Sequence, residues 1–112
     1  KKLILNVALN YGGRLDIVNS VNEFYSKKKK IKNITEKDIN RGLYTKGHSD
    51  VDLLIRTGGQ QRMSNFLLWQ SAYAELFFSK KLWPDFDEKI FVDALYFFQN
   101  TERKFGSISK GT

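Results

Sequence analysis

The chain has 112 residues and carries 19 Lys and Arg against 12 Asp and Glu, so its formal net charge is +7. Hydrophobic residues make up 41% of it and there is one proline, which allows a buried core and excludes a disordered tail. Disulfides and thiolate zinc sites are excluded because there is no cysteine, and no apolar run reaches the roughly 20 residues that cross a bilayer, so we expect a cytoplasmic protein of one domain or part of one.

The first predicted element is residues 3–9, which are almost continuously apolar and favour a parallel strand buried on both faces. A buried strand needs neighbours, and the only methionine is Met63, so we expect the chain to be the C-terminal portion of a longer protein. The segment Asn10-Tyr11-Gly12-Gly13-Arg14 follows, and its paired glycines permit positive φ and a close approach of the backbone to a ligand.

Apolar residues at helical spacing after Arg14 predict a helix that reaches the lysine run at 27–30. That run suits an anionic membrane surface or nucleic acid, but such runs are more often solvated helix ends. Thr35 predicts the capped start of a short helix that ends near Gly42. His48 is the only histidine and lies in a polar loop, where we expect it to be solvated.

Residues 51–55 predict the next strand, which leads directly into a polar loop that begins at Arg56. Ser64 is expected to cap a helix that extends to Tyr73, and residues 75–78 favour another short strand. Asp87 is expected to cap a final helix. This order of elements predicts an α/β fold with a mostly parallel sheet flanked by helices.

The loop after residues 51–55 has the parts of a diphosphate site, because ligands of open α/β sheets bind beyond the carboxyl ends of the strands. Arg56 and Arg62 offer forked donors of fixed charge. Gly58 and Gly59 would let backbone N–H groups approach an anion, and a helix beginning at Ser64 would favour negative charge. The structural alternative stays open, since such arginines often pair with carboxylates and Gly-Gly often only makes a turn. The pattern is neither a Walker loop nor the dinucleotide fingerprint.

Several blocks resemble one known family. The blocks are DLLIRTGGQQRMSNFLLWQ at 52–70, AYAEL at 72–76, LWPDF at 82–86, the turn at 10–14 and ERKFG at 102–106. Together they are similar to the cis-prenyltransferases. Two departures are Lys104, where relatives often have arginine, and Gln60-Gln61, where an acidic and a polar residue are more usual.

The resemblance implies a homodimeric α/β enzyme that uses Mg²⁺ to add isopentenyl diphosphate units, in cis, to an allylic primer such as farnesyl diphosphate. The implied product is undecaprenyl diphosphate, a lipid carrier for the cell wall, and peripheral contact with the membrane is an open expectation.

In such enzymes the residues that match Arg56, Arg62 and Ser64 bind the diphosphate of isopentenyl diphosphate. The residue that matches Glu75 supports the magnesium site or a dimer-linked active site. The possible substrate loop comprises Asn10, Gly12, Arg14, Gly58 and Gly59.

Two family blocks have no match here: the block with the catalytic aspartate and a Ser-Glu-Asn-Trp-like block. We therefore expect no catalytic residue in this chain, which would supply the isopentenyl diphosphate loop and dimer contacts and be inactive alone. One alternative is a non-catalytic accessory subunit, although such relatives usually lose the arginines that Arg56 and Arg62 match. A weaker alternative, a basic nucleic-acid-binding domain, depends on charge alone.

Overall fold

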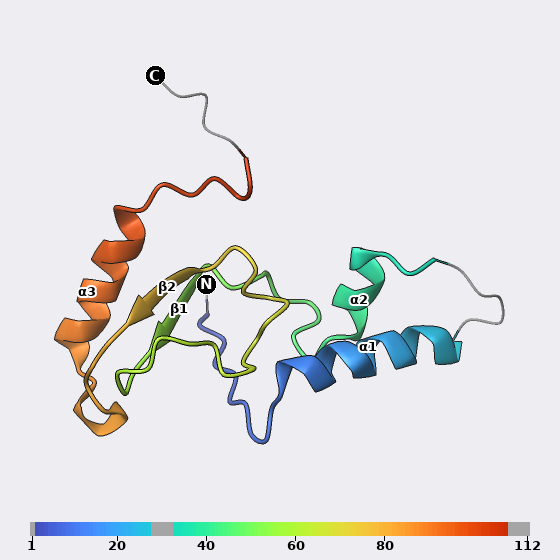
Figure 1. Ribbon diagram of the computed structural model, residues 1–112, viewed down its shortest axis with the longest axis horizontal. Coiled ribbons are helices and arrows are strands. Elements are labelled where there is room, and N and C mark those ends of the chain that lie inside the picture. Colours follow the sequence, from blue (N-terminus) through green and yellow to red (C-terminus); the bar gives the residue numbers. More distant parts are fainter. Residues whose placement is uncertain (1, 28–32, 108–112) are drawn as a thin grey trace. The chain divides into compact units, whose positions relative to one another are not determined.

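The computed structural model describes residues 2–27 and 33–107 (Figure 1). These residues divide into two compact units. The first unit contains the described residues up to His48 together with Ser64–Trp69, and the second contains Ser49–Met63 and the residues from Gln70 onward.

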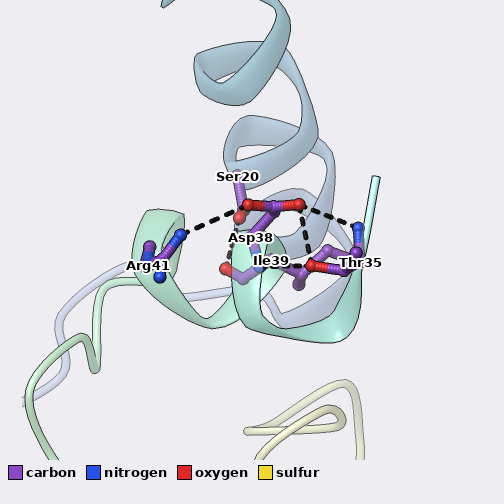
Figure 2. A network of polar contacts seen from close by, with 5 residues as sticks. All are labelled: Ser20, Thr35, Asp38, Ile39 and Arg41. Carbon is purple, nitrogen blue, oxygen red and sulfur yellow. Dashed lines mark hydrogen bonds and ion pairs between the residues drawn. The ribbon is translucent and has the colours of Figure 1, made fainter. Parts of the chain in front are cut away.

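Two helices pack together in the first unit, α1 (Gly13–Lys27) and α2 (Glu36–Gly42). Small side chains let them approach closely: Ser20 of α1 is fully buried, and its hydroxyl donates to the carbonyl of Ile39 at 2.5 Å (Figure 2). A Cβ atom added at Gly42 would lie only 2.8 Å from Cα of Ser20. Glycine is thus required at this position by the close packing of the two helices.

The start of α2 is fixed by local hydrogen bonds. The Thr35 hydroxyl accepts from the Asp38 N–H at 3.3 Å, and the Asp38 carboxylate accepts from the Thr35 N–H at 3.0 Å (Figure 2). This reciprocal pair is a capping box, which satisfies two backbone donors that a helix terminus otherwise leaves without partners. The predicted start at Thr35 and end near Gly42 are confirmed.

The second unit contains two parallel strands, β1 (Leu53–Arg56) and β2 (Glu75–Phe78), in a register that pairs Leu53 with Glu75 and Arg56 with Phe78. A short 3₁₀ helix, η1 (Trp83–Asp85), leads into α3 (Glu88–Gln99), which packs on β2. The rings of Phe77 and Phe97 contribute to this packing, with centroids 5.6 Å apart.

Most predicted elements are present. The helix after Arg14, both strands and the final helix are confirmed, and Asp87 caps α3 by accepting from the Ile90 N–H at 3.0 Å. His48 is exposed, as expected. Lys28–Lys30 of the lysine run lie outside the described residues. No helix in the described ranges combines the length and the hydropathy that a membrane span requires.

The predicted strand at residues 3–9 is wrong. These residues form no regular structure, and Leu3 and Leu9 are 94% and 84% exposed. A strand forms only where its backbone groups pair with a neighbour. In the described part of the chain, the sheet consists of β1 and β2 alone.

The predicted helix from Ser64 to Tyr73 is also wrong, since the chain makes a series of turns there. The φ angles of Ser64, Asn65 and Leu67 are 48°, 65° and 45°. A right-handed helix needs φ near −63°, so these left-handed residues exclude one. Ser64 is therefore not a helix cap.

Candidate functional site

The two loop arginines meet at the carboxyl end of β1. Arg56 is the last residue of β1, and its guanidinium Nη1 donates to the carbonyl oxygen of Arg62. This bond closes the loop between them. The Arg62 residue is exposed, and no carboxylate forms an ion pair with its side chain among the residues that the structure describes. Its fork of donors is therefore accessible to an anionic ligand.

The glycines of this loop turn the chain. Gly58 and Gly59 have φ angles of 92° and 83°, which other residues adopt only with strain. Their N–H groups donate to the carbonyl oxygens of Lys81 at 2.8 Å and Ser79 at 3.0 Å, so the loop is tied to the segment after β2. Both N–H groups therefore have backbone acceptors in this structure, and contact of Gly58 and Gly59 with a diphosphate stays a prediction.

Ser64 is two residues after Arg62 in the sequence but belongs to the first unit. It is exposed, and its left-handed backbone replaces the helix terminus that the sequence predicted. The helix-dipole argument for anion binding at Ser64 is therefore lost. Its hydroxyl remains the candidate ligand, and that role stays a prediction.

The Asn10–Arg14 turn leads into α1. Asn10 has a φ of 53°, whereas neither Gly12 nor Gly13 is among the described glycines with positive φ. A Cβ at Gly12 would lie 3.2 Å from Nδ2 of Asn65, and one at Gly13 would lie 3.0 Å from Cγ of Leu68. These glycines thus permit a close approach of the protein's own chain. Arg14 is exposed, and whether Asn10, Gly12 or Arg14 contacts substrate stays a prediction.

A buried carboxylate supports this turn. Asp16 is 1% exposed and accepts from the Tyr11 hydroxyl at 2.8 Å and from the Tyr44 N–H at 3.0 Å. Its place in the first turn of a helix is typical of a surface residue that favours the helix dipole. The sequence therefore did not indicate that Asp16 links α1 to two loops.

Glu75 lies at the other end of the two strands. It begins β2 opposite Leu53, whereas Arg56 ends β1 opposite Phe78, three residues along. At about 3.3 Å per residue, the two levels are separated by roughly 10 Å. Within one chain, Glu75 and the loop that follows Arg56 therefore lie at opposite ends of the two strands.

The guanidinium of Arg103 contacts Glu75 and two neighbouring acceptors. Its Nη1 donates to Asp52 at 2.6 Å and its Nη2 to the carbonyl of Tyr73 at 3.1 Å, while its Nε lies 3.9 Å from Oε1 of Glu75. The guanidinium also lies 4.5 Å from the centroid of the Phe105 ring. Sequence reasoning assigned Arg103 no role, although the ERKFG block that contains it was one of the signals of family resemblance.

The residues around Glu75 fit magnesium only in part. Within residues 2–27 and 33–107 there is no group of three or more His, Asp or Glu that could hold a metal ion. Mg²⁺ bound to a diphosphate needs only one or two carboxylates, because water and phosphate oxygens supply its other ligands. The 3.9 Å separation from Nε of Arg103 leaves the Glu75 carboxylate able to accept such a contact. Glu75 therefore fits as a single ligand.

Comparison with known proteins places this geometry in a family. Residues 1–106 match the prenyltransferase family model, described as undecaprenyl diphosphate synthase. The chain is 51% identical over 109 residues to the farnesyl-diphosphate-specific ditrans,polycis-undecaprenyl-diphosphate synthase of Haemophilus ducreyi, covering 94% of this chain and 45% of the relative. It is 46% identical to the isoprenyl transferase of Leptospira interrogans, covering 99% of this chain and 48% of the relative. The chain thus spans about half the length of these curated relatives.

Solved structures of related enzymes also match this chain. The crystal structure of a probable undecaprenyl diphosphate synthase from Campylobacter jejuni matches with a TM-score of 0.77 and 36% identity, over 88% of this chain and 45% of that one. Lavandulyl diphosphate synthase from Lavandula x intermedia, in complex with dimethylallyl diphosphate, matches with a TM-score of 0.81 and 39% identity, over 87% of this chain and 44% of that one. The α/β class predicted from the sequence is confirmed. The family model and these structures together show that the chain belongs to the cis-prenyltransferase family.

Proposed function

We propose that the complete protein condenses isopentenyl diphosphate units with farnesyl diphosphate, in cis, to give undecaprenyl diphosphate. The observation that carries this proposal is the exposed guanidinium of Arg62, which lies in the loop that follows β1. The hydrogen bond from the Arg56 guanidinium to the Arg62 carbonyl joins the two ends of this loop. The name of the Haemophilus ducreyi relative, a farnesyl-diphosphate-specific undecaprenyl-diphosphate synthase, supports the choice of substrate and product.

In this proposal the Arg62 guanidinium and the Ser64 hydroxyl bind the diphosphate of isopentenyl diphosphate. Arg56 contributes positive charge and orients the loop through the Arg62 carbonyl. Donors that hold the diphosphate would direct the reacting carbon toward the allylic primer, which supplies the orientation that a two-substrate condensation needs. A magnesium ion, when bound, offsets the charge that develops on the departing allylic diphosphate. Glu75 is the described residue proposed as its ligand.

The proposal extends to the whole protein. The chain would be the C-terminal portion of one prenyltransferase domain, with the catalytic aspartate in the portion that it lacks. The complete enzyme would be a cytoplasmic homodimer that makes a cell-wall lipid carrier and contacts the membrane peripherally. A homodimer also accommodates the opposite placement of Glu75 and Arg56, because one active site could then use residues of two chains.

Arginine substitutions in the complete protein test the loop. We expect Arg62→Ala to raise the KM for isopentenyl diphosphate by about 10- to 100-fold, the effect of losing a charge-assisted hydrogen bond. Arg56→Ala is expected to raise the same KM and lower turnover, because it removes charge and frees the loop. Arg41→Ala is the matched control, since Arg41 is an exposed arginine on α2. An unchanged KM and kcat in both loop variants would contradict the proposal.

A second experiment tests Glu75. We expect Glu75→Gln to raise the Mg²⁺ concentration that gives half-maximal activity, because an amide is a poorer magnesium ligand than a carboxylate. Asp52→Asn is the control, because it disturbs the other carboxylate on Arg103 and leaves the candidate ligand in place. Identical Mg²⁺ titrations for wild type and Glu75→Gln would remove Glu75 from the metal site.

A further inference from the structure

Two segments far apart in the sequence interlock in the first unit. Asn65 accepts from the Gly13 N–H through its backbone carbonyl, at 2.6 Å, and from the Arg14 N–H through its side-chain Oδ1, at 2.9 Å. These are the first two N–H groups of α1, which have no acceptor within the helix. Asn65 therefore caps α1 from a segment 51 residues away from Arg14.

The backbone of this segment is held in a conformation that costs free energy. Asn65 has a φ of 65°, between Ser64 at 48° and Leu67 at 45°. Left-handed φ values cost the least for asparagine among residues other than glycine, and strained residues persist only where their surroundings hold them. The two hydrogen bonds to α1 provide that support.

The turn before α1 also packs closely against the segment that contains Asn65. A Cβ atom at Gly12 or Gly13 would lie 3.2 Å or 3.1 Å from atoms of Asn65, so only glycine permits this contact without displacement. The rings of Phe66 and Tyr11 form a T-shaped pair with centroids 5.5 Å apart, and the buried Asp16 carboxylate accepts a hydrogen bond from the Tyr11 hydroxyl. The turn before α1 and the Ser64–Phe66 segment thus form one rigid piece.

We propose that Asn65 is a positioning residue for isopentenyl diphosphate binding, because it fixes the adjacent Ser64 hydroxyl and the Asn10–Arg14 turn relative to each other. This inference rests on the proposed function, in which Ser64 binds the diphosphate. Asn65 does not need to touch the substrate. It acts through the backbone that it shares with Ser64 and through the two N–H groups of α1.

Two substitutions in the complete protein separate the roles of Asn65. Asn65→Gly tolerates the positive φ but removes the Oδ1 acceptor, whereas Asn65→Ala also disfavours the left-handed backbone. We expect Asn65→Gly to raise the KM for isopentenyl diphosphate by about tenfold and Asn65→Ala to raise it further, with a smaller change in kcat, because misplacing a binding group by 1 Å costs up to about 100-fold. Asn22→Ala, at an exposed position of α1, is the control and should leave both constants unchanged.

A double-mutant cycle with Ser64→Ala distinguishes positioning from general stability. If Asn65 acts through Ser64, adding Asn65→Gly to Ser64→Ala should change the KM by less than about twofold, because coupled residues give non-additive effects. Circular dichroism verifies that Asn65→Gly is folded, both alone and combined with Ser64→Ala. The test therefore does not depend on whether Asn65→Ala folds. Multiplicative effects in the cycle, or an unchanged KM in Asn65→Gly, would overturn the role of Asn65 while an active wild type upholds the proposed function. A wild type that makes no polyprenyl diphosphate would overturn both.

Discussion

At the scale of single residues, the charge of a side chain says little about its role until its partners are known. Arg103 and Arg41 are both arginines paired with an aspartate. Arg103 is 17% exposed and bonded to Asp52 and to a backbone carbonyl, whereas Arg41 is 76% exposed and has a single contact of 3.4 Å to Asp38. Only the first arrangement replaces the hydration that the guanidinium loses on burial.

This contrast predicts a difference in stability. Arg103→Ala should lower the free energy of unfolding of the complete protein by about 2–3 kcal/mol, because it removes two charge-assisted hydrogen bonds of a largely buried guanidinium and its contacts with two phenylalanine rings. Arg41→Ala should lower it by about 0.5 kcal/mol or less, as an exposed helix pair does. Urea unfolding of both variants measures these values. Equal effects of the two substitutions would show that Arg103 is not a structural anchor.

At the scale of secondary structure, local signals predicted the elements that local interactions stabilise. The caps at Thr35 and Asp87 involve residues three positions apart, so the sequence shows both partners. The Ser64–Tyr73 segment has apolar residues at helical spacing, yet it is not a helix. Its conformation depends on Asn65 hydrogen bonds to Gly13 and Arg14, which are distant in the sequence. Tertiary contacts thus override local preference there.

The cap of α3 gives a prediction at this scale. Asp87→Ala should lower the free energy of unfolding by about 1 kcal/mol, because the Ile90 N–H loses its acceptor at the helix terminus. Asp87→Ser should retain most of the stability, since its hydroxyl is also a good cap. Glu88→Ala is the neighbouring control, with no capping hydrogen bond to lose. Thermal unfolding of the three variants measures these differences. An Asp87→Ala variant that is no less stable than Glu88→Ala would contradict the role of the cap.

At the scale of the whole molecule, the apolar segment at residues 3–9 has no cover among the described residues. Five of its large side chains are between 67% and 94% exposed: Leu3, Ile4, Leu5, Val7 and Leu9. Burying a leucine contributes about 1.5–3 kcal/mol, so this exposure is unfavourable. The curated relatives are about twice as long as this chain, and we propose that the remainder of the complete protein covers the segment.

Hydrogen exchange tests that proposal. We expect the amides of residues 3–9 to exchange at least about 100-fold more slowly in the complete protein than in the 112-residue chain, because cover by the remainder of the protein would protect them from solvent. The same preparations serve for an activity assay, in which the chain alone is expected to make no polyprenyl diphosphate. The amides of α3 provide the internal control. Equal exchange of residues 3–9 in both proteins would show that the remainder of the protein does not cover this segment.

The sequence by itself determined the α/β class, the caps of α2 and α3 and the family, because apolar periodicity, capping residues and loop motifs are properties of neighbouring residues. It also placed Arg56 and Arg62 in one loop, where the structure joins the guanidinium of Arg56 to the backbone of Arg62. Only the tertiary structure decided that the Gly58 and Gly59 N–H groups are already bonded, that Asp16 is buried and that Asn65 caps a distant helix. Those features depend on which distant segments pack together, and the free energy of that packing is not encoded in any single stretch of the chain.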